Sequence, residues 1–247
     1  MVGYLGYLFG EHLSEKSNEV ENNIRGSDGP EVTRDETYEI LPSPEQWETY
    51  SYRQICEHFS CSEHSRDQSK PLHILESWNL FREKYNEVVD DSFKFDDPVP
   101  PTQGYSIDIV NHAPPPFVAK FSPGMGRGVF ATRDISEGEL VHNGNHSAMK
   151  FADAMAWRRF VFSLPKKMAC DIVEWSWTQK LSDDGRLQTF VDLNISAFFN
   201  TGWSRKSNVG PKESTSMKFY AAGDIKKGTE LLYNYNMYET NWDKVGL

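Results

Sequence analysis

The sequence predicts a mostly β C-terminal half with α-helical insertions, preceded by a helical, acidic N-terminal region. Short apolar segments separated by glycine turns dominate from residue 117 onward, which is typical of small sheets. Apolar residues recur at spacings of three and four within residues 74–85, which favours a helix there. The net charge of −10 is uneven, at −13 over residues 1–116 and +3 over residues 117–247.

The N-terminal region divides by composition into two parts. Residues 1–40 are acidic and polar, with the turn-forming pair Gly29 and Pro30, so we expect a disordered segment. Residues 41–95 are expected to be helical, because Pro44 follows a serine as in the first turn of a helix. The apolar face expected in this helical region consists of Ile74, Leu75, Trp78, Phe81 and Tyr85.

A proline-rich connector follows at residues 96–116. It contains Pro98, Pro100 and Pro101 and ends in three consecutive prolines. Proline favours extended chain because it lacks a backbone donor. We therefore place the main domain boundary here and expect residues 117–247 to form the second domain.

Short strands and turns are expected within residues 117–247. Residues 117–121 and 129–131 have strand composition, and residues 188–193 alternate after a hairpin turn, as residues 175–177 do before it. The segment Phe-Ala-Thr-Arg-Asp-Ile-Ser-Glu-Gly at 130–138 is echoed by Tyr-Ala-Ala-Gly-Asp-Ile-Lys-Lys-Gly at 220–228, which indicates two similar strand–turn–strand corners. Residues 147–164 have helical composition, and Pro165 ends that helix.

The cysteine content is low. Three cysteines, Cys56, Cys61 and Cys170, do not suggest a disulfide framework and favour a reducing compartment. Cys56, His58, Cys61 and His64 lie within nine residues, which raises a zinc hypothesis. The common zinc fingers separate their ligand pairs by a longer loop, so we prefer ordinary helix and loop residues and predict no metal site.

Composition also disfavours two classes of partner. No run of about 18 apolar residues is present, which argues against a membrane span. The acidic N-terminal part argues against direct nucleic-acid binding, and it fits either a segment that attracts basic partners or a solvated face. No clear targeting signal is recognisable, so we expect an intracellular location, in the nucleus or the cytoplasm.

Three motifs carry the functional prediction. The first is Gly-Met-Gly-Arg-Gly-Val-Phe-Ala at residues 124–131, followed by Asp-Ile-Ser-Glu-Gly-Glu at 134–139. The second is Asn-Ile-Ser-Ala-Phe-Phe-Asn at 194–200, and the third is Asp-Ile-Lys-Lys-Gly-Thr-Glu-Leu-Leu-Tyr-Asn-Tyr at 224–235. If the third motif is a strand, Tyr233 and Tyr235 point to the same side and can line one pocket.

Together, in this order, the motifs resemble the SET domain of protein-lysine methyltransferases, over roughly half of the chain. The resemblance implies a SET-type fold of small sheets, in which the second and third motifs thread together into a pseudo-knotted site. It also implies S-adenosyl-L-methionine as the cofactor and a lysine-containing protein as the substrate, a histone tail or a non-histone protein. Cofactor and target lysine would enter from opposite faces.

The resemblance assigns roles to individual residues. Tyr235 would orient the amine and the methyl group, and Tyr233 occupies a position where tyrosine implies monomethylation. Gly126 and its neighbours would let the backbone approach the amino-acid end of the cofactor. The cofactor-binding residues implied in this way are Met125, Gly126, Arg127, Asn200, Thr201 and Tyr235.

The second motif departs from the family pattern. Ala197, Thr201 and Gly202 replace the family's Arg, His and Ser, and the cysteine triad that binds zinc after the domain is absent, because no Cys follows Tyr235. Two functions therefore stay open. One is an active S-adenosylmethionine-dependent protein-lysine methyltransferase, and the other is a catalytically weak or inactive SET-fold module for protein binding.

Overall fold

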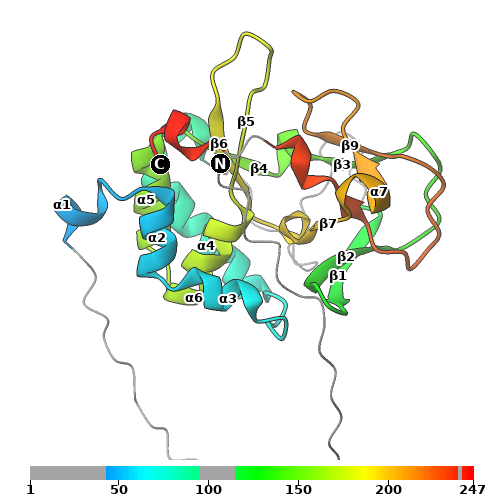
Figure 1. Cartoon of the computed structure of the whole chain (residues 1–247), viewed down its shortest axis with the longest axis horizontal. Helices are drawn as coiled ribbons and strands as arrows, with labels where there is room; N and C mark the ends of the chain where they lie inside the picture. The colour runs from blue at the N-terminus through cyan, green and yellow to red at the C-terminus, as the bar shows by residue number, and fades with distance from the viewer. Residues whose placement is uncertain (1–42, 95–114, 239–240) are drawn as a thin grey trace, which may run out of the picture. The chain divides into compact units, whose positions relative to one another are not determined.

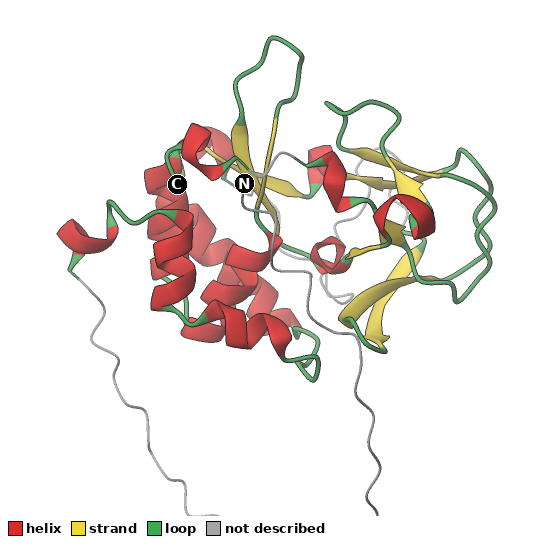
Figure 2. Cartoon of the chain, viewed as in Figure 1, coloured by secondary structure: helices red, strands yellow, loops and turns green. Residues whose placement is uncertain are grey.

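The structure is a computed structural model that describes residues 43–94, 115–238 and 241–247. The segment 1–40, expected to be disordered, lies outside the described residues, as does most of the connector. Residues 42–247 form one compact unit. Within this unit most of the longer helices gather on one side and most strands on the other (Figure 2). None of the helices in the described ranges is long and apolar enough to cross a membrane.

Helices fill the described part of the N-terminal region (Figure 1). They are α1 (Pro44–Trp47), α2 (Tyr52–His58), α3 (Cys61–Arg66) and α4 (Leu75–Val88), followed by a 3-10 turn at Asp91–Phe93. Helix α2 begins at a capping box formed by Ser51 and Gln54. Helix α4 buries Trp78, Phe81 and Tyr85, as the spacing predicts, whereas Ile74 precedes the helix and is 64% exposed.

These helices share a hydrophobic core with two helices of the following domain, α5 (Ala154–Phe162) and α6 (Lys166–Trp175). Helix α3 packs on α6, and α4 packs on α5. The Tyr52 hydroxyl donates to the Val173 carbonyl at 2.8 Å, and the Tyr85 hydroxyl donates to the Lys150 carbonyl at 2.7 Å. The helical region therefore shares one hydrophobic core with the second domain. The domain boundary expected in the connector at residues 96–116 stays a prediction.

Four small sheets make up the rest, which confirms the predicted mostly β domain. The antiparallel pair is β1 (Phe117–Ser122) with β2 (Gly126–Ala131). One three-stranded sheet has the order β3 (Leu140–Asn143), β9 (Lys218–Ala221), β8 (Val209–Gly210), and the other β4 (Ala148–Phe151), β6 (Gln188–Asp192), β5 (Trp177–Gln179). The fourth sheet is the parallel pair β7 (Asn200–Thr201) and β10 (Leu232–Tyr233).

The helix expected over residues 147–164 is wrong for its first part. Residues 148–151 form strand β4, which pairs with β6 in the register Ala148↔Asp192. Met149 and Phe151 are buried and alternate with half-buried neighbours, so the local period is two. Helix α5 begins only at Ala154, where the Asp153 carboxylate accepts from the Ala156 backbone N–H. Trp175, expected in a strand, ends helix α6.

The two echoed segments form similar corners that face each other. Ile135 and Ile225 exchange two backbone hydrogen bonds of 2.9 Å. Gly138 and Gly228 close the turns with φ angles of +76° and +85°, a conformation that favours glycine. The repeat seen in the sequence is thus a pair of corners joined by a bridge, and it places the third motif beside the first.

Candidate functional site

The three motifs meet at one place in the fold. Strand β10 of the third motif pairs in parallel with β7 of the second motif, in the register Leu232↔Asn200 and Tyr233↔Thr201. The Leu231 backbone N–H donates to the Val129 carbonyl at 2.8 Å, so the third motif also lies against strand β2 of the first. Segments separated by about 70 and 30 residues in the chain are therefore side by side, as the resemblance implied.

Asn200 joins the motifs through its side chain. Its Nδ2 donates to the Arg127 carbonyl at 2.8 Å and to Glu230 Oε1 at 2.9 Å. Ser122 Oγ donates to the other oxygen of Glu230 at 2.9 Å. Both N–H donors of the Asn200 amide are used within the protein, which leaves its carbonyl oxygen as the atom suited to a ligand.

Gly128 is required at this junction. A Cβ on Gly128 would overlap Glu230 Oε1 and would lie 3.0 Å from Asn200 Nδ2 and from the Ser122 Cβ. Only a residue without a side chain lets the carboxylate and the amide approach the strand this closely. Gly128, the third glycine of the motif, therefore has a packing function, in addition to the cofactor approach that the sequence suggests.

The predicted cofactor residues of the first motif lie in different environments. Gly124 and Gly126 have φ angles of +80° and +78° in the turn between β1 and β2, and Met125 between them is 41% exposed. No atom of the described residues lies within 4 Å of a Cβ built on Gly124, so that side of the turn has room for a ligand beside the described part of the chain. Arg127 is 6% exposed, and its guanidinium pairs with the buried carboxylate of Asp171.

The two tyrosines are close but differ in exposure. Tyr233 is buried and stacks on Phe219, with ring centroids 4.5 Å apart and planes 3° apart. Tyr235 is 43% exposed, its ring centroid lies 6.2 Å from that of Tyr233, and its hydroxyl donates to the Phe199 carbonyl. Strand β10 ends at Tyr233, because the Asn234 side chain accepts from the Asn236 backbone N–H and turns the chain into a 3-10 helix (Tyr235–Met237).

Desolvation affects the protonation of both phenols. It raises the pKa of the buried Tyr233 well above its ordinary value, and it also raises the pKa of Tyr235, whose ring is partly exposed but whose hydroxyl lies against the Phe199 carbonyl. Both side chains therefore stay neutral near pH 7. They can donate and accept hydrogen bonds, but they are not strong bases.

A cavity of about 10 Å³, the volume of about one water molecule, lies beside Phe219 and Tyr238, two rings that contact Tyr233. Its lining residues are His142, Gly144, Trp177, Gln179, Asp192, Met217, Phe219 and Tyr238. Desolvation raises the pKa of Asp192 to about 6, and Ser147 Oγ donates to its carboxylate at 2.9 Å. Asp192 was not among the site residues predicted from the sequence. The single carboxylate in the strand-like run at residues 188–193 could have indicated it.

The stretch considered for zinc is divided among separate partners. Cys61 forms a disulfide with Cys170, and His64 Nε2 lies 2.8 Å from Asp171 Oδ1. The Cys56 thiol is free, and burial raises its pKa to about 11. The disulfide runs against the expectation from the low cysteine count, which suggested no disulfide framework and a reducing compartment. Its two cysteines are 109 residues apart and neither has a local signature.

Comparison with protein families matches residues 126–236 to the SET domain. This chain contains a SET domain. The match contains the second and third motifs and all of the first except Gly124 and Met125, and it runs from the glycine at the start of β2 to the residue after Tyr235. No curated protein matches the sequence.

Solved structures similar to this chain include Polycomb Repressive Complex 2 of Chaetomium thermophilum in an autoinhibited conformation bound to S-adenosylmethionine, at 26% identity over 54% of this chain and a TM-score of 0.37. Another is a Plasmodium falciparum protein assigned as a histone methyltransferase, at 18% identity over 52% of this chain and 96% of its own, with a TM-score of 0.32. The chain covers only 16% of the length of the first of these. At TM-scores this low, neither similarity bears on function.

After Asn200 the chain makes a tight turn at Gly202. A Cβ on Gly202 would come within 2.6 Å of the Ser207 nitrogen and 2.9 Å of the Leu232 Cβ, so the tight turn into helix α7 (Trp203–Lys206) requires glycine. Trp203 has a φ angle of +50° and is 52% exposed. The replacement of the family's Ser by Gly202 is thus tied to this turn.

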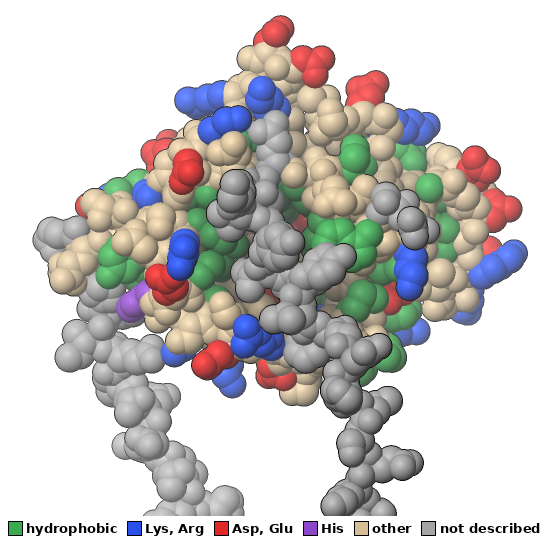
Figure 3. Space-filling model, viewed as in Figure 1, with side chains coloured by type: hydrophobic (Ala, Val, Ile, Leu, Met, Phe, Trp, Pro, Cys, Tyr) green, Lys and Arg blue, Asp and Glu red, His purple; other side chains and the backbone are tan. Residues whose placement is uncertain are grey.

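Figure 3 shows hydrophobic side chains at several places on the face that it displays, with charged groups mostly near its edge.

Proposed function

We propose that this chain is an S-adenosylmethionine-dependent protein-lysine methyltransferase. The observation that carries the proposal is the junction of the three SET motifs, where Asn200 connects the backbone of Arg127 to Glu230. Tyr233 and Tyr235 lie at the end of the third motif, where β10 pairs with the Asn200 strand. The contact between the Asn200 strand, Arg127 and the Tyr233 strand supports this proposal.

The proposed cofactor site lies along the glycine turn and the Asn200 strand. The exposed Met125 and the backbone of Gly126, which packs beside Gln68, would contact the cofactor, and Arg127 would contribute through its main chain because its side chain is paired with Asp171. Asn200 would accept a hydrogen bond through its amide oxygen. Thr201 and Tyr235 complete the proposed set. S-adenosyl-L-methionine would supply the methyl group on a sulfonium.

The reaction needs a neutral lysine amine in line with that methyl group. A lysine in water has a pKa of about 10.4, and desolvation among aromatic rings disfavours the charged form. Alignment is then the main contribution of the protein. Tyr235 would orient the amine, and the buried Tyr233, held against Phe219, would limit the space around it. We infer monomethylation from this restriction.

The substrate would be a lysine-containing protein, a histone tail or a non-histone protein. The acidic residues 1–116 would attract a basic segment of such a partner. Direct binding to nucleic acid or membrane is not part of the proposal. An intracellular location, in the nucleus or the cytoplasm, follows from this substrate class.

A second candidate function is a catalytically weak or inactive SET-fold module for protein binding. It is favoured by the replacement of family residues by Ala197, Thr201 and Gly202. It is also favoured by the internal use of both Asn200 donors and of the Arg127 side chain, which leaves fewer groups for a cofactor.

One experiment separates the two functions. Binding of S-adenosylmethionine to the full chain is measured by calorimetry, and methylation of a lysine peptide array is read by mass spectrometry. The methyltransferase proposal expects micromolar binding and a mass gain of one methyl group, lost in Tyr235→Phe and kept in Tyr220→Phe, a tyrosine of β9 that contacts Lys212. Binding without transfer, or no binding by a folded chain, supports the interaction module.

A further inference from the structure

Asp171 is the centre of a buried ionic cluster that includes residues from distant segments. Its carboxylate is 2% exposed and lies on helix α6. Arg127 donates to both of its oxygens, at 2.5 and 3.2 Å. His64 Nε2 lies 2.8 Å from one oxygen, and His73 Nε2 lies 2.7 Å from the other. The four contacts use the acceptor sites of a carboxylate fully.

The partners of Asp171 keep its carboxylate ionised despite its burial. Burial alone would raise the pKa of Asp171, but hydrogen bonds from His64, His73 and Arg127 lower it well below the usual range. The Lys70 ammonium lies 3.9 Å from the same carboxylate and 2.8 Å from Glu174. A bidentate arginine pair of this kind fixes direction as well as distance, which a lysine at the same position would not do.

Arg127 connects this cluster to strand β2, which is called the cofactor strand below because it begins at the glycine turn of the proposed cofactor site. It lies between Gly126 and Gly128, which have no side chains to hold the backbone in place. The Arg127 guanidinium also lies over the rings of Trp175 and Phe198, 5.1 and 4.8 Å from their centroids. Its side chain is therefore the anchor of the strand whose carbonyl accepts from Asn200.

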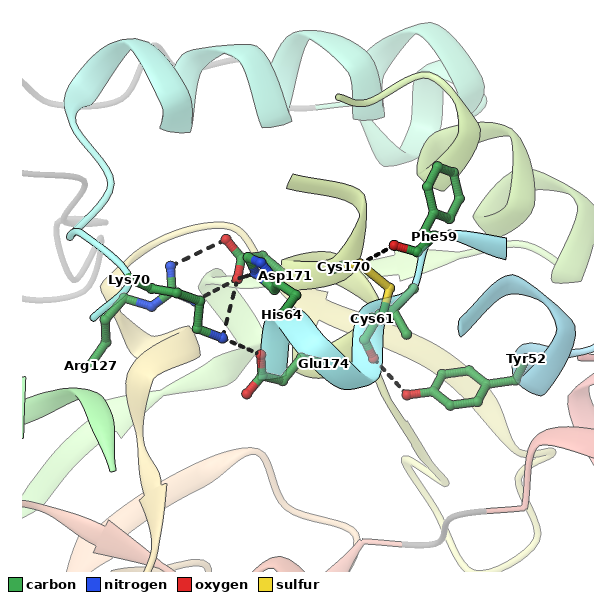
Figure 4. The surroundings of a disulfide bond; sticks show 10 residues. Tyr52, Phe59, Cys61, His64, Lys70, Arg127, Cys170, Asp171 and Glu174 are labelled. Carbon is green, nitrogen blue, oxygen red and sulfur yellow. Dashed lines mark hydrogen bonds and ion pairs between the residues drawn. A yellow bond between two sulfur atoms is a disulfide. The ribbon is translucent and has the colours of Figure 1, made fainter. Parts of the chain in front are cut away.

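The helical N-terminal region supplies the two histidines that contact Asp171, the partner of this anchor. His64 lies on α3, and His73 lies in the segment before α4. Gln68, in the same segment, donates from its side chain to the Gly124 carbonyl at 2.9 Å, so it also holds the glycine turn. Figure 4 shows His64, Lys70 and Arg127 directed at Asp171, with the Cys61–Cys170 disulfide joining α3 to α6 beside them.

We propose that Asp171 is a positioning residue for the cofactor strand, and that it holds the strand through Arg127 with the help of His64 and His73. The inference rests on the proposed function for its link to S-adenosylmethionine. It makes the helical region part of the cofactor site, although no residue of that region belongs to the SET motifs. It extends the site beyond the residues assigned from the motifs.

The test uses the full chain and two buried arginines with matched exposure. Arg127 is 6% exposed and Arg158 is 7% exposed, but Arg158 donates to the Tyr50 and Gly246 carbonyls and not to the cluster. Asp171→Asn and Arg127→Lys are expected to raise the Kd for S-adenosylmethionine at least tenfold. Arg158→Lys is expected to change the Kd less than twofold, even where it lowers the melting temperature.

A conservative rescue distinguishes positioning from general loss of structure. His73→Gln keeps a side-chain N–H that can reach Asp171, and His73→Ala removes it. We expect the Kd of His73→Gln to stay within threefold of that of the unchanged chain and the Kd of His73→Ala to rise more. This pair keeps the Arg127–Asp171 contact, so it remains informative if Asp171→Asn does not fold. Equal Kd values for the two folded variants would overturn the proposal.

Hydrogen exchange gives a second readout that does not depend on the cofactor. Asp171→Asn, or His73→Ala if the former does not fold, should speed amide exchange in residues 126–131, and Arg158→Lys should not. If the unchanged chain does not bind S-adenosylmethionine, the proposed function fails. The positioning role of Asp171 is then tested by hydrogen exchange alone. Unchanged exchange in β2 would overturn that role.

Discussion

Loss of the Cys61–Cys170 disulfide is expected to destabilise the chain strongly. The bond closes a loop of 109 residues and joins α3 to α6, with both cysteines buried. A cross-link of this kind acts mainly by restricting the unfolded chain, and longer loops give the larger effect. Reduction, or Cys170→Ser, removes that restriction while leaving the packing of the two helices in place.

The magnitude follows from the loop length. The chain-entropy relation for a loop of 109 residues corresponds to about 4.8 kcal/mol at 25 °C, and measured disulfides typically contribute about 2–4 kcal/mol. We therefore expect the free energy of unfolding to fall by about 2–4 kcal/mol. For a folded unit of this size, the melting temperature would fall by about 4–16 °C.

The assay is urea unfolding of the full chain with and without a dithiol reductant, together with thiol quantification. Cys56→Ser is the control, because the Cys56 thiol is free and its high pKa makes it a poor exchange partner. This variant should keep the response to reductant. Equal unfolding midpoints in both conditions, or three free thiols in the native oxidised protein, would refute the reasoning.

Three further predictions concern single residues. Gly128→Ala should cost about 1–3 kcal/mol of stability because its Cβ meets Glu230, whereas Gly223→Ala, with open space around it, should change stability by less than about 0.5 kcal/mol, as chemical denaturation would show. Asp192 has its pKa raised to about 6, so the native state binds more protons than the unfolded chain between about pH 4 and 6. The free energy of unfolding therefore falls as the pH rises through this range, by up to about 3 kcal/mol. Asp192→Asn should remove this fall, and an unchanged pH profile of the unfolding free energy in the variant would contradict the prediction. Asp171 has a lowered pKa, so its contribution is complete above about pH 4 and is lost as the pH falls further; acid unfolding of Asp171→Asn should therefore be less steep than that of the unchanged chain.

The motifs in the sequence were sufficient to predict that their three segments meet in the fold. Tyr233, Asn200 and the glycines of residues 124–128 come together because the order and spacing of the three motifs are those of the SET family. The buried face of α4 was also predictable, since helical periodicity depends only on near neighbours. Strand β4 was assigned to a helix, because its ladder with β6 lies about 40 residues away in the chain and overrides local composition.

The SET domain, its small sheets and the residues of its three motifs could be predicted from the sequence. The contact of Arg127 with Asp171, the two histidines His64 and His73 beside it, and the bond between Cys61 and Cys170 became visible only in the folded chain. Each of these residues is ordinary in its own local sequence. The contacts arise because the N-terminal helices share a core with α6, and pairing across such distances leaves no periodic signal in the chain.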